Sequence, residues 1–79
     1  MYDEKPKTIR VEGNIAPELI DLQKMVKGYI QVIEKGNKQF VCNEEGLLLN
    51  LPYNEEASEE ANEHLVGNVV ILTDNNRIR

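Results

Sequence analysis

The stretch PELIDLQKMVKGYIQVIEKGNKQFVC, residues 17–42, decides the fold, because a helix pattern in it is followed directly by a strand-turn-strand pattern. Leu19, Leu22 and Val26 recur at helical spacing behind Pro17, which suits a first helical turn. Gly28 can take the left-handed conformation that closes many helices. The first part of the stretch therefore predicts a helix over residues 17–27.

Strand patterns fill the rest of this stretch and recur at both ends of the chain. Residues 29–34 are rich in Ile, Val and Tyr, and a turn at 35–38 joins them to the apolar residues 39–42, which predicts a hairpin. Residues 8–12 alternate between apolar and polar side chains, as in a half-buried strand. Residues 69–72 are apolar on both faces and are best explained as an inner strand of the sheet.

The segment after the hairpin mixes turn residues with a short apolar run. Asn43, two glutamates and Gly46 form a turn signal, and Gly46 can adopt positive φ. Residues 47–49 are all leucine, which adds a candidate strand. Pro52 cannot donate to a sheet ladder, so the chain is expected to leave the sheet there.

A second helix is predicted over residues 55–64. Asn54 is a suitable N-cap, and the stripe of Ala57, Ala61 and Leu65 can lie on the sheet. Glutamates repel one another at the same helical spacing, so this helix should be marginal.

The order β-α-β-β-β-α-β predicts one small α+β domain over residues 1–79. We expect a sheet of four to five strands with both helices on one face. Residues 74–79 are polar and are expected to form a flexible tail.

The composition implies a thin core. A chain of 79 residues buries only about 60% of its unfolded surface. Cys42 is the single cysteine and His64 the single histidine, which excludes an intrachain disulfide and a Cys/His zinc cluster. Self-association is the remaining way to add stability, so we expect a homo-oligomer. Cys42 is interpreted as a small buried hydrophobe.

The net charge of −5 is unevenly distributed. Residues 1–38 carry seven Lys/Arg and six Asp/Glu, giving +1, whereas residues 39–79 carry two and eight, giving −6. This acidic half disfavours direct nucleic-acid binding. The chain shows neither a signal-peptide pattern nor a membrane-length apolar run, so we expect a cytoplasmic protein without membrane contact.

Four stretches resemble one family. They are LQKMVKGYI at 22–30, VCNEEG at 41–46, LPYNEEA at 51–57 and VGNVV at 66–70. The chain is similar to the domain-of-unknown-function family 3846 of phage, plasmid and bacterial proteins over most of residues 9–72. Lys27 stands where the family has the first of two glycines, and Gln31 where it has an acidic residue.

This resemblance implies a fold and a biological setting but no reaction. By analogy, small phage proteins are often accessory proteins directed at the host, and some are oligomers that sequester cyclic-nucleotide immune signals without cutting them. We therefore expect a non-catalytic anti-defence protein that binds a small nucleotide-like signalling molecule in the host cytoplasm. Others are acidic mimics that occupy nucleic-acid sites on host enzymes. The alternative is therefore an acidic inhibitor or nucleic-acid mimic that binds a basic host protein.

The polar cluster between the hairpin and the second helix supplies the candidate ligand contacts. Turn chemistry explains most of it, but Tyr53 and the neighbouring amides could also stack on and read a base. Phosphate would need lysines from the other half of the chain, for which Lys24, Lys27, Lys35 and Lys38 are candidates. The residues expected to bind the ligand are Tyr29, Asn43, Glu44, Gly46, Asn50, Tyr53 and Asn54.

The alternative function uses the face formed by Glu55, Glu59 and Glu63, which could meet a basic protein surface. No catalytic residues are proposed, because the adjacent carboxylates Glu44 and Glu45 diverge in a turn and lack further oxygens for a metal. His64 is interpreted as a helix-end histidine. No metal or cofactor is expected.

Overall fold

The structure is a computed structural model that describes residues 5–11, 13, 16–73 and 76–78. Its helices and strands follow the predicted order with one strand fewer. The elements are β1 (Thr8–Arg10), α1 (Leu19–Val26), β2 (Ile30–Lys35), β3 (Lys38–Asn43), α2 (Glu55–Ala61) and β4 (Val69–Thr73).

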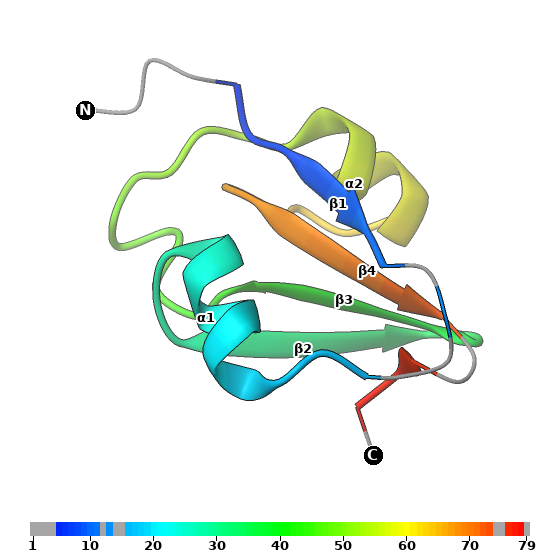
Figure 1. Ribbon diagram of the computed structural model, residues 1–79. Coiled ribbons are helices and arrows are strands. Elements are labelled where there is room, and N and C mark those ends of the chain that lie inside the picture. The colour runs from blue at the N-terminus through cyan, green and yellow to red at the C-terminus, as the bar shows by residue number, and fades with distance from the viewer. Residues whose placement is uncertain (1–4, 12, 14–15, 74–75, 79) are drawn as a thin grey trace.

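The strands form one sheet in the order β1-β4-β3-β2 (Figure 1). β1 pairs with β4 in parallel, while β3 is antiparallel to both β4 and β2. The predicted hairpin and the inner position of β4 are therefore confirmed. With a four-stranded sheet and two helices, the chain has the predicted α+β fold.

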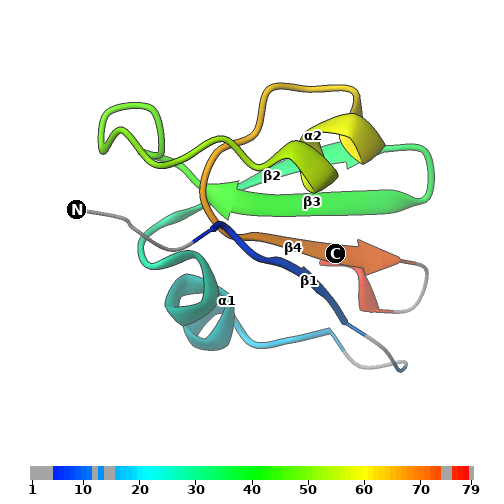
Figure 2. The same ribbon diagram turned by 90° about the horizontal axis from the view of Figure 1, so that it is seen from above.

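The two helices cover opposite faces of the sheet, as Figure 2 shows. Leu22 and Val26 of α1 pack against Val41, Val70 and Leu72. The alanines of α2 pack on the other face, in a core cluster that includes Phe40, Cys42, Val69 and Ile71. The prediction of both helices on one face was wrong, because β3 and β4 are apolar on both faces and each face requires a cover.

Both helices end in a left-handed residue that is not glycine. Lys27 closes α1 with φ 63°, and Asn62 closes α2 with φ 55°. The predicted cap at Gly28 was wrong. Glycine is needed there for space, since a Cβ would lie 2.7 Å from the side-chain nitrogen of Asn43.

Residues 44–50 form a turn, so the predicted strand at 47–49 was wrong. Local backbone hydrogen bonds close the segment, including Leu49 N to Glu45 O and Leu51 N to Gly46 O. The three leucines are exposed. Positive φ occurs at Asn50, not at Gly46, where a Cβ would lie 2.7 Å from Val66.

Part of the C-terminal segment is attached to the sheet. Asn76 is buried; its Oδ1 accepts a hydrogen bond from Thr73 N, and its Nδ2 donates to Val11 O. Ile78 N donates to the side chain of Gln39. Residues 76–78 thus differ from the flexible tail expected for 74–79, of which 74, 75 and 79 lie outside the described residues.

Candidate functional site

Asn43 connects the end of β3 to the end of α1. Its side chain is buried, and Nδ2 donates to the carbonyls of Val26 (3.1 Å) and Lys27 (3.2 Å). Oδ1 accepts a hydrogen bond of 2.7 Å from Glu45 N. The amide group is therefore occupied within the fold and fixes the last carbonyls of α1.

Asn54 connects α2, the start of β1 and the loop before β4. Its Oδ1 accepts hydrogen bonds from Ala57 N (3.0 Å), as the predicted N-cap, and from Thr8 Oγ1 (3.1 Å). Its Nδ2 donates to Lys7 O (3.3 Å) and Gly67 O (3.0 Å). The N-cap prediction is confirmed, and the same side chain also holds two distant backbone segments.

Asn68 is a third residue of this kind, which the sequence interpretation missed. Its Oδ1 accepts a hydrogen bond from Lys7 N, and its Nδ2 donates to Met25 O, both at 2.9 Å. Nothing in the local sequence distinguishes it from a turn residue, since both partners are far away in the chain.

These asparagines fix the backbone around a small pocket at one end of the sheet, which we call the lysine pocket. Its volume is about 90 Å³. The pocket is lined by Lys5, Pro6, Lys7, Val26, Lys27, Leu51, Pro52, Gly67 and Asn68. The described lining thus contains three lysines and no carboxylate, although acidic residues outnumber basic ones by 14 to 9 in the whole chain.

Of the lysines considered for phosphate, only Lys27 lines this pocket. Lys35 pairs with Glu63 at 2.6 Å, and Lys38 pairs with Glu60 at 2.8 Å. Lys5 and Lys7 were missed, because only the parallel pairing of β1 with β4 brings the N-terminal segment beside α1.

A larger groove of about 440 Å³ lies on the face of the sheet that carries α2. It contains three predicted ligand residues, Asn43, Glu44 and Gly46. The other lining residues are Gln31, Ile33, Cys42, Leu47, Leu48, Glu63, His64, Leu65 and Val66. Burial raises the pKa of the Cys42 thiol, which favours its protonated form.

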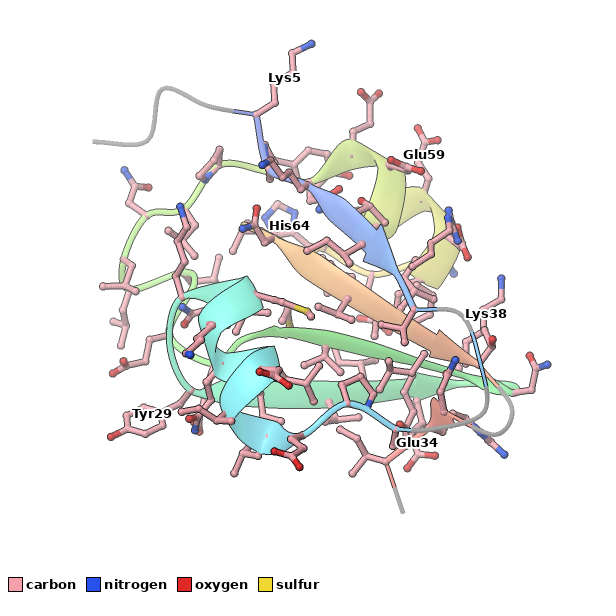
Figure 3. The ribbon with its side chains drawn as sticks, viewed as in Figure 1. Lys5, Tyr29, Glu34, Lys38, Glu59 and His64 are labelled. Carbon is pink, nitrogen blue, oxygen red and sulfur yellow. The ribbon has the colours of Figure 1, made fainter. Side chains whose placement is uncertain are left out.

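The remaining candidate residues do not join one site. The ring of Tyr53 stacks on His64 with centroids 4.9 Å apart, beside the groove. Tyr29 is 66% exposed and points away from the body of the protein (Figure 3). Asn50 is exposed in the 44–50 turn. Asn54 lies behind the lysine pocket, where it holds Lys7 and Gly67.

The negative charge of α2 is partly neutralised by basic side chains of the neighbouring strands. Arg10 contacts Glu60 at 2.6 Å and Glu56 at 3.3 Å. Hydrogen bonds from Arg10 and Lys38 lower the pKa of Glu60 from 4.5 to about 2. Of the alternative partner-binding residues, Glu63 is paired, while Glu55 and Glu59 are exposed and form no ion pair with any residue that the structure describes.

Fold and site together define a small α+β domain with a pocket whose described lining holds three lysines and no carboxylate. The chain belongs to the family described as domain of unknown function (DUF3846), whose model matches residues 2–78. No curated protein and no solved structure is significantly similar to it. None of the helices in the described ranges has the length and apolar character needed to cross a membrane.

Proposed function

We propose that this chain is a non-catalytic phage accessory protein that sequesters a small phosphate-bearing, nucleotide-like signalling molecule in the host cytoplasm. We further propose that it acts as a homo-oligomer. The observation that supports binding most directly is the lysine pocket, where three lysines gather and none of the described lining residues is a carboxylate, in a chain of net charge −5.

The pocket suits an anion for a second reason, which concerns the end of α1. The last carbonyls of a helix carry partial negative charge and would repel a phosphate. Here the amide of Asn43 donates to the carbonyls of Val26 and Lys27, and Asn68 donates to that of Met25. The asparagines thereby reduce this repulsion beside the lysines.

The size of the pocket limits what it can hold. Pockets that hold drug-sized ligands have volumes of about 300–1,000 Å³. A volume of about 90 Å³ therefore suits a group such as phosphate and not a whole nucleotide. The rest of the ligand would lie outside the pocket, while Asn43 and Asn54 act by positioning the backbone.

The chemistry of the pocket supports binding without turnover. The described lining offers lysine ammonium groups and one asparagine amide, with no carboxylate, histidine, cysteine or hydroxyl side chain. Lysines acting as fixed charges are sufficient to hold a phosphate.

A charge reversal with a matched control tests this proposal. Lys27 lines the pocket, whereas Lys24 is an exposed lysine of the same helix that does not. Titration calorimetry with inorganic pyrophosphate, mononucleotides and cyclic dinucleotides should show binding that Lys27→Glu weakens by roughly tenfold. Lys24→Glu changes the net charge equally and should weaken it by less than about twofold.

Native mass spectrometry of the protein mixed with a host-cell extract then identifies the ligand. A mass increase that is released unchanged on denaturation would support sequestration. Absence of binding to every phosphate probe and to the extract, or equal loss in both lysine variants, would contradict the proposal.

The alternative is that the protein inhibits a basic host protein through Glu55, Glu59 and Glu63. The exposed carboxylates of Glu55 and Glu59 favour it. Its third residue is less available, because Glu63 pairs with Lys35. Reversing Glu55 and Glu59 to lysine should abolish capture of such a partner and spare pyrophosphate binding, which separates the two functions.

A further inference from the structure

The strand β2 presents an open backbone edge. It is the last strand of the sheet and pairs with β3 at all six of its residues, without a bulge. In an antiparallel pair, the backbone groups of successive residues point alternately towards and away from the partner strand. The hydrogen bond of 2.8 Å from Glu44 N to Tyr29 O shows that the backbone of Tyr29 points towards β3. The backbone groups therefore point towards β3 at Tyr29, Gln31, Ile33 and Lys35. They point outward at Ile30, Val32 and Glu34.

Apolar side chains flank this edge on both sides. Val32 is 37% exposed in the strand itself. Leu47 and Leu48 are 74% and 84% exposed and line the groove together with Gln31 and Ile33 of β2. Natural edge strands are commonly protected by proline, bulges or a covering segment. In the described residues β2 contains no proline or bulge, and its charged side chains, Glu34 and Lys35, are confined to one end of the strand.

We propose that β2 pairs antiparallel with β2 of a second copy of this chain, about a twofold axis at Val32. In this register Val32 faces the partner's Val32, and Ile30 faces the partner's Glu34. It engages all three outward-facing residues of each strand and would form about six backbone hydrogen bonds. The sheets of the two copies then become one continuous sheet.

The charges along β2 are compatible with a second copy as the occupant of this edge. The twofold axis places the two copies of Glu34 at opposite ends of the interface, each against isoleucine, and sets Lys35 against the partner's Tyr29. Gln31 faces the partner's Ile33, so no like charges are directly opposed. Pairing also covers apolar surface, which a chain of 79 residues needs for stability.

The pairing affects the groove on the α2 face. Gln31 and Ile33 belong to both the groove and the edge strand, so the grooves of the two copies would meet across the interface. This dimer is independent of what the lysine pocket binds, and its test does not use a ligand.

The test uses the self-contact that the twofold axis imposes on residue 32. Analytical ultracentrifugation of the wild type should show a dimer, and Val32→Lys or Val32→Glu should each weaken dimerisation by roughly tenfold or more, because like charges then face each other. Mixing the two variants should restore a dimer, since lysine then faces glutamate. Glu34→Lys is the control: it faces isoleucine and should change dimerisation by less than about threefold.

Several outcomes would overturn the proposal. One is a wild type that stays monomeric at its highest soluble concentration. Another is an oligomer that forms equally well in both Val32 variants, which would place the interface elsewhere. Failure of the mixed variants to pair, while circular dichroism shows both folded, would reject the twofold axis at Val32. Strand capture of only a foreign peptide at this edge would also contradict it.

Discussion

Lys27 adopts a backbone conformation that L-residues disfavour. Its φ of 63° and ψ of 44° are left-handed, where a Cβ crowds the following carbonyl at a cost of about 1–2 kcal/mol. The family that the sequence resembles has glycine at this position. Here a lysine occupies it and lines the lysine pocket, so the chain retains local strain at a residue to which we assign binding.

We predict that Lys27→Gly stabilises the fold. Removing the strained Cβ should gain more than the added flexibility of the unfolded chain costs, for a net increase of about 1 kcal/mol in the free energy of unfolding. Urea denaturation measures it. Asn62→Gly is the control: Asn62 also has positive φ, but asparagine tolerates this conformation, so its gain should be smaller. An equal gain at both positions, or destabilisation at Lys27, would contradict this explanation.

The asparagines show how far sequence reasoning reaches at single residues. Asn54 was predictable as a cap, because its partner Ala57 lies three residues away. Its second partner, Lys7, is 47 residues away and becomes a neighbour only when β1 pairs with β4. The lysine pocket could not be predicted for the same reason, since Lys5 and Lys7 come from one end of the sequence and Lys27 from another element.

At the scale of elements, α2 depends on polar contacts more than on apolar packing. It buries only Ala57, Ser58 and Ala61, and small side chains supply little hydrophobic free energy. Glu60 compensates for this weak apolar packing, since it accepts hydrogen bonds from Arg10 of β1 and Lys38 of β3. Arg10 also contacts Glu56, so the predicted repulsion between these two glutamates is offset by a cation close to both.

The lowered pKa of Glu60 predicts a specific pH dependence. The pKa is about 2 in the folded state and 4.5 in the unfolded reference, so the contribution to stability is complete above pH 4.5. It is lost as the pH falls from there towards about 2. Near neutral pH, Glu60→Gln should lower the free energy of unfolding by about 1–2 kcal/mol, a value reduced for solvent screening because Arg10 is half exposed.

Urea denaturation across this pH range checks the prediction. The difference between wild type and Glu60→Gln should disappear near pH 2, where the wild-type carboxylate is being protonated. Glu59→Gln is the control, because Glu59 is exposed and has no ion pair with any described residue. A difference for Glu60→Gln that does not change with pH would mean that packing, and not charge, holds α2.

The placement of the helices shows what the element patterns could and could not predict. Strand order within the hairpin and the central position of β4 followed from turns and two-sided apolar patterns. The same two-sided pattern in β3 and β4 also requires a helix on each face. The order of the elements along the chain does not say which face each helix covers. The leucines at 47–49 led to a wrong strand prediction, because an apolar run can face solvent or a partner as well as a core.

At the scale of the whole molecule, charge is separated in a way that the net value hides. Arg10, Lys35 and Lys38 are engaged with the glutamates on and just after α2, whereas the described lining of the lysine pocket holds no carboxylate. An acidic protein can therefore present a local site for an anion. Long-range repulsion from a charge of −5 should still slow anion association at low salt.

The proposed dimer predicts an alternating pattern of amide exchange along β2. Amides of Gln31, Ile33 and Lys35 bond to β3 and should exchange slowly at every protein concentration. Those of Ile30, Val32 and Glu34 face outward and should be protected only when a second strand is paired. Nuclear magnetic resonance at low and high concentration, with Val32→Lys as the monomeric control, measures both sets in one chain. Outward amides that stay slow in the dilute variant would mean that the single chain covers its own edge. Outward amides that stay fast in a proven dimer would place the interface on another surface.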